Sequence, residues 1–157
     1  MREKGRIIRP TVAALLLLVS SGGYAQSREA KAGATKPCPV TLPNGSQPPT
    51  KMLSGPLMHG NGKLWVVLTP DGKWRVKPSR GGSIVTKLAW WREVKGPFTI
   101  EGRRLDAPAG PLRSISNGGD SGFLPSNIFL PSAGCWEITG KVADAELTFV
   151  GEFIPKK

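Results

Sequence analysis

The sequence predicts an all-β domain in which two antiparallel sheets stack as a sandwich and one disulfide closes the fold. Many short segments rich in β-branched and aromatic residues alternate with turn signals at near-regular spacing, which is typical of a sandwich. The 15 prolines and 20 glycines are spread along the chain and disfavour long helices. The chain has only two cysteines, far apart, behind an N-terminal export signal.

The first 25 residues have the organisation of a secretory signal. Four basic residues precede an apolar run over residues 12–19. The small residues Gly23 and Ala25 then stand at the −3 and −1 positions of a cleavage site after Ala25. The apolar run is too short for a stable membrane anchor, which needs about 20 residues. No later segment is apolar enough to cross a membrane, so we expect none in the mature chain.

The mature chain is expected to form one domain. Residues 26–37 are small and charged and predict a flexible linker, followed by a β-domain over residues 38–157. The signal holds four of the 22 basic and one of the 11 acidic residues, which leaves 18 basic and 10 acidic residues after cleavage. The basic residues are scattered, and a diffuse positive field favours anionic surfaces of the envelope. Export argues against a nucleic-acid partner.

Cys38 and Cys135 are predicted to form a disulfide. Two thiols that enter an oxidising compartment usually pair. A bridge between them closes a loop of roughly 100 residues, which the chain-entropy model values at about 4–5 kcal/mol. The two cysteines lack the two-residue spacing of a redox couple, and a single histidine supplies too few further ligands for zinc.

The N-terminal half of the domain begins with a short strand pattern at Cys38–Leu42 and an irregular stretch over residues 51–61. The run 63–69 is then rich in β-forming residues, and Trp74–Lys77 alternates apolar and basic residues. Because the Pro70–Lys73 turn separates these two runs, we expect them to pair as a hairpin.

Four further segments predict the middle strands. They are residues 83–92, 98–102, 112–115 and 123–130. Pro125 interrupts the last of them, and we expect a bend or bulge there because proline cannot donate to a β-ladder. Residues 116–122 are rich in Gly, Ser, Asn and Asp and predict a loop.

The C-terminus predicts a second hairpin, between residues 135–139 and 145–153. Strand periodicity puts Trp136 and Ile138 on the face opposite Cys135. In the second strand the residues Leu147, Phe149 and Phe153 share one face.

The motif Gly134-Cys135-Trp136-Glu137-Ile138-Thr139-Gly140 gives the chain a family resemblance. Together with residues 122–131, the pair Trp90-Trp91 and the run 101–108, it resembles small secreted bacterial proteins that carry a Gly-Cys-Trp-Glu-(Ile/Val)-Thr strand. The resemblance covers residues 63–153. It implies an immunoglobulin-like sandwich in a secreted or periplasmic protein, and it implies no reaction. The first cysteine lies at the start of the domain and the tryptophan adjoins the second cysteine, so the likeness to antibody domains is one of architecture.

Tryptophans are the best candidates for a binding surface. Five are present: Trp65, Trp74, Trp90, Trp91 and Trp136. Adjacent strand residues face opposite ways, so one of Trp90 and Trp91 is expected to be buried and the other exposed. An exposed tryptophan beside Arg92 is suited to stack on a sugar ring or to anchor a protein, and Trp74 is a further candidate. The alternative is that these aromatic side chains simply fill the core.

Two other functions stay open as alternatives. Met52, Met58 and His59 offer thioether and imidazole ligands for copper in a periplasmic metal-handling protein. A loop such as 117–122 is able to enter the cleft of a target enzyme, as in a protease inhibitor. The run Gly119–Gly122 echoes the nucleophile motif of trypsin-like proteases, but the chain is too short for that fold and His59 has no matching context.

The sequence therefore predicts a secreted, non-catalytic binding module without a cofactor. The expected partner is an envelope component or another exported protein, reached through an edge strand or an exposed aromatic patch.

Overall fold

The computed structural model describes residues 37–156, and all of them lie in strands, turns or irregular segments. The predicted signal at 1–25 lies outside the described residues, as does the predicted linker at 26–37 apart from Pro37. None of the described residues belongs to a helix of the length and hydrophobicity that a membrane crossing requires.

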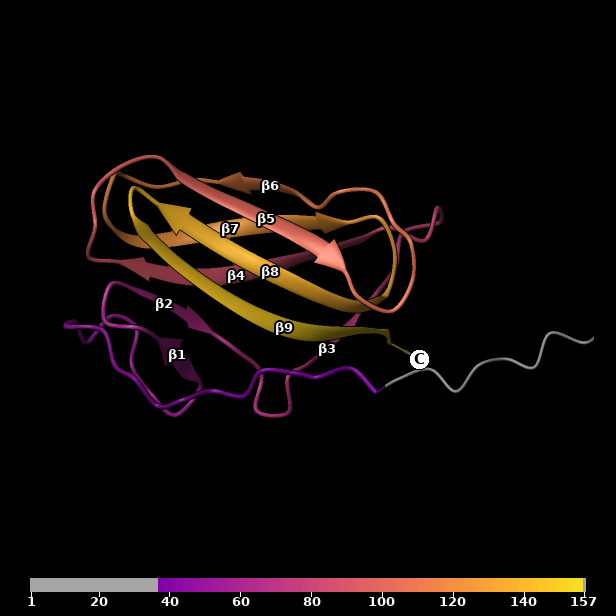
Figure 1. Ribbon diagram of the computed structural model, residues 1–157, viewed down its shortest axis with the longest axis horizontal. Helices are drawn as coiled ribbons and strands as arrows, with labels where there is room; N and C mark the ends of the chain where they lie inside the picture. The colour runs from indigo at the N-terminus through magenta and orange to yellow at the C-terminus, as the bar shows by residue number, and fades with distance from the viewer. Residues whose placement is uncertain (1–36, 157) are drawn as a thin grey trace, which may run out of the picture. The chain divides into compact units, whose positions relative to one another are not determined.

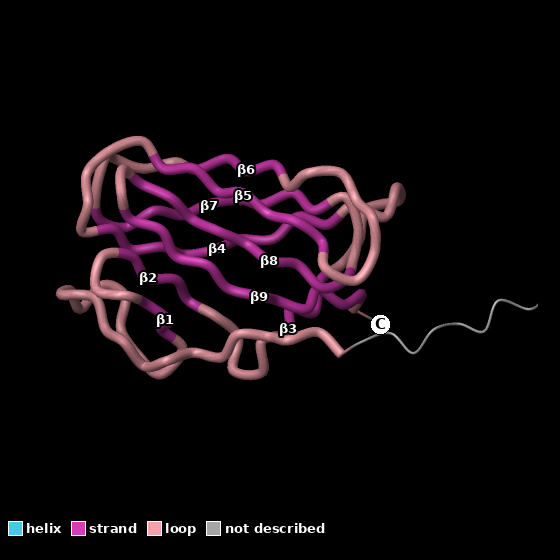
Figure 2. The backbone as a smooth tube through the Cα atoms, viewed as in Figure 1, coloured by secondary structure: helices cyan, strands magenta, loops and turns pink. Residues whose placement is uncertain are grey.

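Nine strands form two sheets within the described chain (Figures 1 and 2). They are β1 (Met58–Gly60), β2 (Leu64–Val67), β3 (Lys73–Val76), β4 (Ile84–Arg92), β5 (Phe98–Arg104), β6 (Arg113–Ser116), β7 (Gly122–Leu130), β8 (Gly134–Val142) and β9 (Ala145–Pro155). The five-stranded sheet has the order β1-β2-β4-β7-β6, and the four-stranded sheet has the order β3-β9-β8-β5. All neighbours are antiparallel except β3 and β9, which run parallel.

The core lies between the inward faces of the two sheets. The five-stranded sheet contributes Trp90, Leu88 and Ile128, and the four-stranded sheet contributes Trp136 and Phe149, all of them buried. Buried and more accessible residues alternate along β7, β8 and β9, as expected for strands with one face on a core. The all-β sandwich with one disulfide is confirmed.

The hairpin predicted between residues 63–69 and 74–77 is wrong. β2 pairs with β1 and β4, whereas β3 pairs with β9 in the other sheet. The turn between β2 and β3 carries the chain across from one layer to the other, and Gly72 within it has a φ of 65°. Alternation shows that a strand has one buried face, but it does not show which sheet the strand joins.

Most of the other predicted elements are confirmed as strands. The C-terminal hairpin forms between β8 and β9, with Trp136, Ile138 and Phe149 buried as predicted. The bulge predicted at Pro125 is absent, because Pro125 pairs with Ala89 in an uninterrupted one-to-one register. The carbonyl of Pro125 accepts from the N–H of Asn117, one residue beyond the end of β6. The N–H that proline lacks would point to that same side, so the ladder between β7 and β4 loses no donor.

The segment from Cys38 to Pro48, which we call the N-terminal strap, forms no strand where one was predicted over residues 38–42. Figure 1 shows the strap running along the side of the domain next to β9 and β1. The N–H of Thr41 donates to the carbonyl of Val150 at 2.8 Å, and Thr41 Oγ1 accepts from the N–H of Val150 at 2.9 Å. Further along, Asn44 bonds both backbone groups of Gly60 in β1. The strap therefore links the two sheets at one open side.

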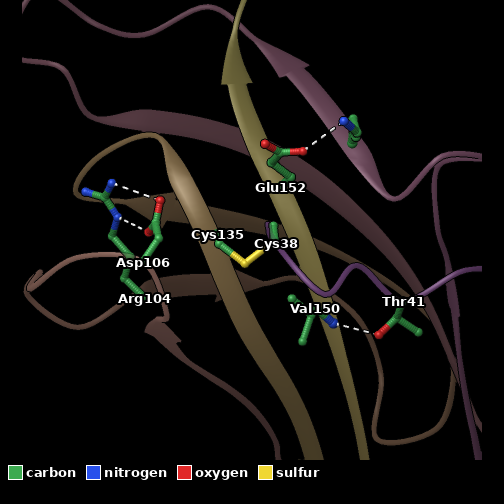
Figure 3. The surroundings of a disulfide bond; sticks show 8 residues. Cys38, Thr41, Arg104, Asp106, Cys135, Val150 and Glu152 are labelled. Atoms are coloured by element: carbon green, nitrogen blue, oxygen red, sulfur yellow. Dashed lines mark hydrogen bonds and ion pairs between the residues drawn. A yellow bond between two sulfur atoms is a disulfide. The ribbon is translucent and has the colours of Figure 1, made fainter. Parts of the chain in front are cut away.

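The predicted disulfide is present between Cys38 of the strap and Cys135 of β8 (Figure 3). Cys135 faces away from Trp136 and Ile138, so the bridge lies on the outer side of the four-stranded sheet. Beside it, Arg104 forms an ion pair with Asp106, and the Nε–Oδ1 distance is 2.6 Å (Figure 3). The bridge fixes the start of the strap to the sheet.

Candidate binding surface

The outer face of the five-stranded sheet carries a cluster of apolar and aromatic side chains. Trp65 of β2 lies opposite Trp91 of β4, and Trp91 lies opposite Phe123 of β7. Residues opposite one another on neighbouring strands point to the same face, so these three rings form one row across the sheet. Phe123 is 38% exposed and Trp91 is half-buried, while the strap covers Trp65.

The cluster continues along the sheet to its other end. Val85 of β4 lies opposite Phe129 of β7, and Phe129 lies opposite Arg113 of β6. The guanidinium of Arg113 lies over the Phe129 ring, 5.6 Å from its centroid. Lys87 and Ile115 occupy the row between, on either side of Asn127. We call this surface the aromatic face; its exposed or half-buried members are Trp91, Phe123, Phe129, Val85, Ile115, Lys87 and Arg113.

The aromatic face carries cations without acidic partners. Within residues 37–156 neither Lys87 nor Arg113 forms an ion pair. The acid at its border, Glu93, accepts a hydrogen bond from the indole N–H of Trp91. The face is thus both aromatic and positively charged.

The outer face of the four-stranded sheet is different in kind. Its cations are matched by acids across neighbouring strands, as in the pairs Lys73–Glu152, Arg103–Glu137 and Lys141–Glu101. Exposed pairs of this type contribute little to stability, but they leave a surface with balanced charge. The aromatic face therefore stands out as the surface that is suited to an anionic partner.

The structure places three of the four predicted binding residues in the interior. Trp90 is fully buried against Phe98 and Phe149, and Arg92 is 2% exposed at the end of β4. Trp74 stacks on Phe153 in the core with ring centroids 5.0 Å apart. Trp74, Trp90 and Arg92 are therefore not part of an exposed binding surface, because their strand positions face the other sheet; for the two tryptophans the alternative of core packing holds.

Trp91 is the predicted residue that does reach the surface. Trp90 and Trp91 face opposite ways and Trp90 is buried, as expected, but Trp91 is half-buried where an exposed ring was expected. Its neighbours on the aromatic face, Phe123, Phe129 and Val85, were missed as site residues. Residues 123–130 alternate as a strand, but the sequence does not show that β7 pairs with β4 and aligns these side chains.

The structure separates two ligands of the alternative copper site, because Met58 and His59 are consecutive in β1 and their side chains point to opposite faces of the sheet. Met58 is buried and His59 lies in β1, and residues 51–61 were expected to be irregular. Nδ1 of His59 lies 3.2 Å from the carbonyl oxygen of Leu42 in the strap. Among the described residues no group of three or more His, Cys, Asp or Glu side chains converges as a metal site would require.

The segment 117–122, considered as an inhibitory loop, is tied to the body of the domain, and its last residue, Gly122, begins β7. The carbonyl of Gly119 accepts from Nη2 of Arg92 at 2.5 Å, and the carbonyl of Asp120 accepts from the N–H of Gly96 at 2.9 Å. These bonds hold the loop against the segment that follows β4.

Comparison with protein-family models, with curated proteins and with solved structures finds no match for this chain. The aromatic face is therefore interpreted from its own residues, and the resemblance of the C-terminal motif to a group of secreted bacterial proteins stays a prediction.

Proposed function

We propose that this protein is a secreted, non-catalytic binding module of the bacterial envelope, and that its aromatic face binds an acidic cell-wall polysaccharide. The proposal rests on one observation: exposed and half-buried aromatic rings share one sheet face with two cations that form no ion pair within the described part of the chain. Aromatic rings present an apolar surface on which a sugar ring can stack. Lys87 and Arg113 supply the charge that attracts an acidic polymer.

The compartment is supported by the disulfide between Cys38 and Cys135. Disulfides form and persist in oxidising spaces such as the periplasm and the medium. Together with the export signal predicted over residues 1–25, the bridge favours a protein that works outside the cytoplasm.

The proposed fold family is immunoglobulin-like, and the strand order supports it. The order β2-β4-β7-β6 corresponds to the A-B-E-D sheet of an immunoglobulin domain, and β5-β8-β9 corresponds to C-F-G. The disulfide differs, since it joins the strap to the outer side of β8, the F-like strand, instead of joining the two sheets. Trp90 and Trp136 occupy the core that those two sheets share.

The proposal is tested by sedimentation of the exported protein with purified, insoluble acidic cell-wall polysaccharide. We expect binding that weakens as salt rises, because screening reduces attraction between exposed charges. Trp91→Ala and Phe123→Ala should each weaken binding about tenfold, or about 1.4 kcal/mol. Lys87→Gln should weaken it and reduce its salt dependence.

Matched controls lie on the other sheet. Thr148→Ala and Lys141→Gln alter the outer face of the four-stranded sheet and should bind like the wild type. Equal binding by the Trp91 and Thr148 variants, or no binding by the wild type, contradicts the proposal. Binding to anionic lipid vesicles in place of the polysaccharide, with the same dependence on Trp91, would replace the proposed partner by a membrane surface.

A further inference from the structure

A buried cation without an acidic partner lies at one end of the sandwich. Arg92 is the last residue of β4, faces inward like Trp90, and is 2% exposed. Its Nη2 donates to the carbonyl of Gly119 at 2.5 Å, and Nη1 donates to the carbonyl of Gly96 at 3.4 Å. Both acceptors are neutral, and Nε of Arg92 has no hydrogen-bond partner among the described residues.

This arrangement is costly as it stands. A guanidinium taken out of water needs partners that replace its hydration, and a buried charge with too few of them destabilises the fold. Burial lowers the pKa of Arg92, and the negative charge of Asp120 acts in the opposite direction. Asp120 is itself exposed and forms no ion pair with Arg92. The pairing capacity of the guanidinium is therefore unfilled.

An open cavity of about 340 Å³ adjoins the guanidinium. It lies between the segment that follows β4 and the loop that precedes β7, and Arg92, Phe98, Ser116, Asp120 and Leu124 contribute to its lining. The guanidinium lies over the ring of Phe98, 5.6 Å from the centroid. Cavities of this size hold small organic ligands, and one cation with apolar walls is a common way to fix their orientation.

We propose that this cavity binds an organic monocarboxylate, whose carboxylate pairs with the guanidinium of Arg92. Guanidinium and carboxylate are matched in geometry and in charge. Arg92 is the only basic residue among those that line the cavity, and Asp120 is the only acidic one. A dianion such as phosphate would carry a second negative charge toward Asp120, whereas a monoanion neutralises Arg92. Phe98 and Leu124 favour a ligand with an apolar part beside its carboxylate.

The site is independent of the aromatic face. Trp91 and Arg92 are consecutive in β4, but they point to opposite sides of the sheet. A free carboxylic acid and the uronic-acid unit of a polysaccharide offer the same group to Arg92. The probes of the experiment distinguish these two sources.

The test follows the Arg92 Nε–H signal of the folded protein by nitrogen-proton NMR. The protein is titrated separately with benzoate, benzyl alcohol, phosphate, and glucuronate as a monosaccharide and as an oligosaccharide. The signal is assigned by its loss in Arg92→Lys. We expect benzoate or glucuronate to shift it with saturable binding, benzyl alcohol not to, and phosphate to bind at least about tenfold more weakly. A response to the oligosaccharide alone identifies the polymer as the source.

Asp120→Asn keeps Arg92 and provides a second test of the proposed carboxylate site. Removing the competing acid should tighten benzoate binding severalfold, and Trp91→Ala should leave it unchanged, which separates this site from the proposed polysaccharide surface. No shift with any carboxylate overturns the proposal. It is also overturned if phosphate binds as well as benzoate, or if carboxylates bind only to Asp120→Asn, which would show that Asp120 itself pairs with Arg92 in solution.

Discussion

Gly140 of β8 leaves the space that the indole ring of Trp90 of β4 fills. A Cβ atom built on Gly140 would lie 2.7 Å from Cη2 of Trp90 and 2.7 Å from Cζ of Phe98. Gly151 of β9 stands in the same relation to Trp74, with a Cβ at 2.5 Å from its ring. Two large rings thus pack directly over the backbone of β8 and β9, because glycine at these inward positions leaves room for them.

Gly140→Ala is expected to destabilise the fold by about 1–3 kcal/mol, the usual cost of adding a methyl group to a packed core. The atoms that the new methyl group would meet belong to the rigid rings of Trp90 and Phe98, which cannot turn aside as a flexible side chain could. The measurement is the free energy of unfolding from urea denaturation. Gly81→Ala is the matched control, since Gly81 is exposed and a Cβ there meets nothing closer than 4.0 Å. Equal stability of the two variants would show that the sheets move apart without cost.

Removal of the disulfide should destabilise the domain by about 2–5 kcal/mol, because the bridge restricts the unfolded chain over a sequence separation of 97 residues. Cys38→Ala combined with Cys135→Ala tests this with a small change in volume. Thr41→Val is the control for the strap: it removes one hydrogen bond to Val150 and should cost about 1 kcal/mol. If the double cysteine variant is no less stable than Thr41→Val, the strap stabilises the domain through its hydrogen bonds and the disulfide adds no more than one of them does.

Most strands could be predicted from the sequence because each has one solvent-facing and one core-facing side. The segments that became β4, β5, β8 and β9 alternate clearly, and the turn between β8 and β9 is short, so their pairing followed. The predicted pairing of β2 with β3 was wrong, because the same turn residues occur in hairpins and at points where a chain passes from one sheet to the other. β1 escaped notice because three residues are too few to show a period.

The candidate site was half predictable for a related reason. Period two requires that Trp90 and Trp91 face opposite ways, but it does not say which one faces the core. That choice also decides Arg92, which shares the direction of Trp90 and so becomes buried. The alignment of Trp91 with Phe123 depends on the register of β4 and β7. Two other strands separate them in the chain, so no hairpin turn fixes that register.

Ala143→Gly should stabilise the protein by about 0.5–1 kcal/mol. Ala143 lies in the turn between β8 and β9 with a φ of 49°, in the left-handed region that costs a residue with a Cβ about 1–2 kcal/mol. Glycine relieves that strain and gives back part of the gain through the greater entropy of its unfolded chain. Ala109→Gly is the control, because Ala109 is exposed and is not at positive φ. There the substitution should only destabilise the protein, through the greater entropy of the unfolded chain. Thermal unfolding of both variants distinguishes them by the sign of the change.

Acid should weaken the fold through the Arg104–Asp106 pair beside the disulfide. A side-chain hydrogen bond from Arg104, followed by a backbone hydrogen bond from Cys135, lowers the pKa of Asp106 below its ordinary value of 3.8, against the effect of its partial burial. A carboxyl whose pKa is lower in the folded state stabilises the fold above its unfolded pKa. That contribution is lost as the pH falls from the unfolded pKa through the folded pKa.

Asp106→Asn should therefore cost about 1 kcal/mol at neutral pH, the upper end for a pair that keeps some exposure to water. Its stability should converge on that of the wild type once the pH lies below the folded pKa of Asp106, because the wild-type carboxyl is then neutral as well. Asp144→Asn is the matched control: Asp144 pairs with Lys63, but its side chain is 76% exposed, so screening by water leaves a smaller effect. A difference between wild type and Asp106→Asn that stays constant with pH would mean that Asp106 acts through its shape and its neutral hydrogen bonds, and that its charge contributes nothing.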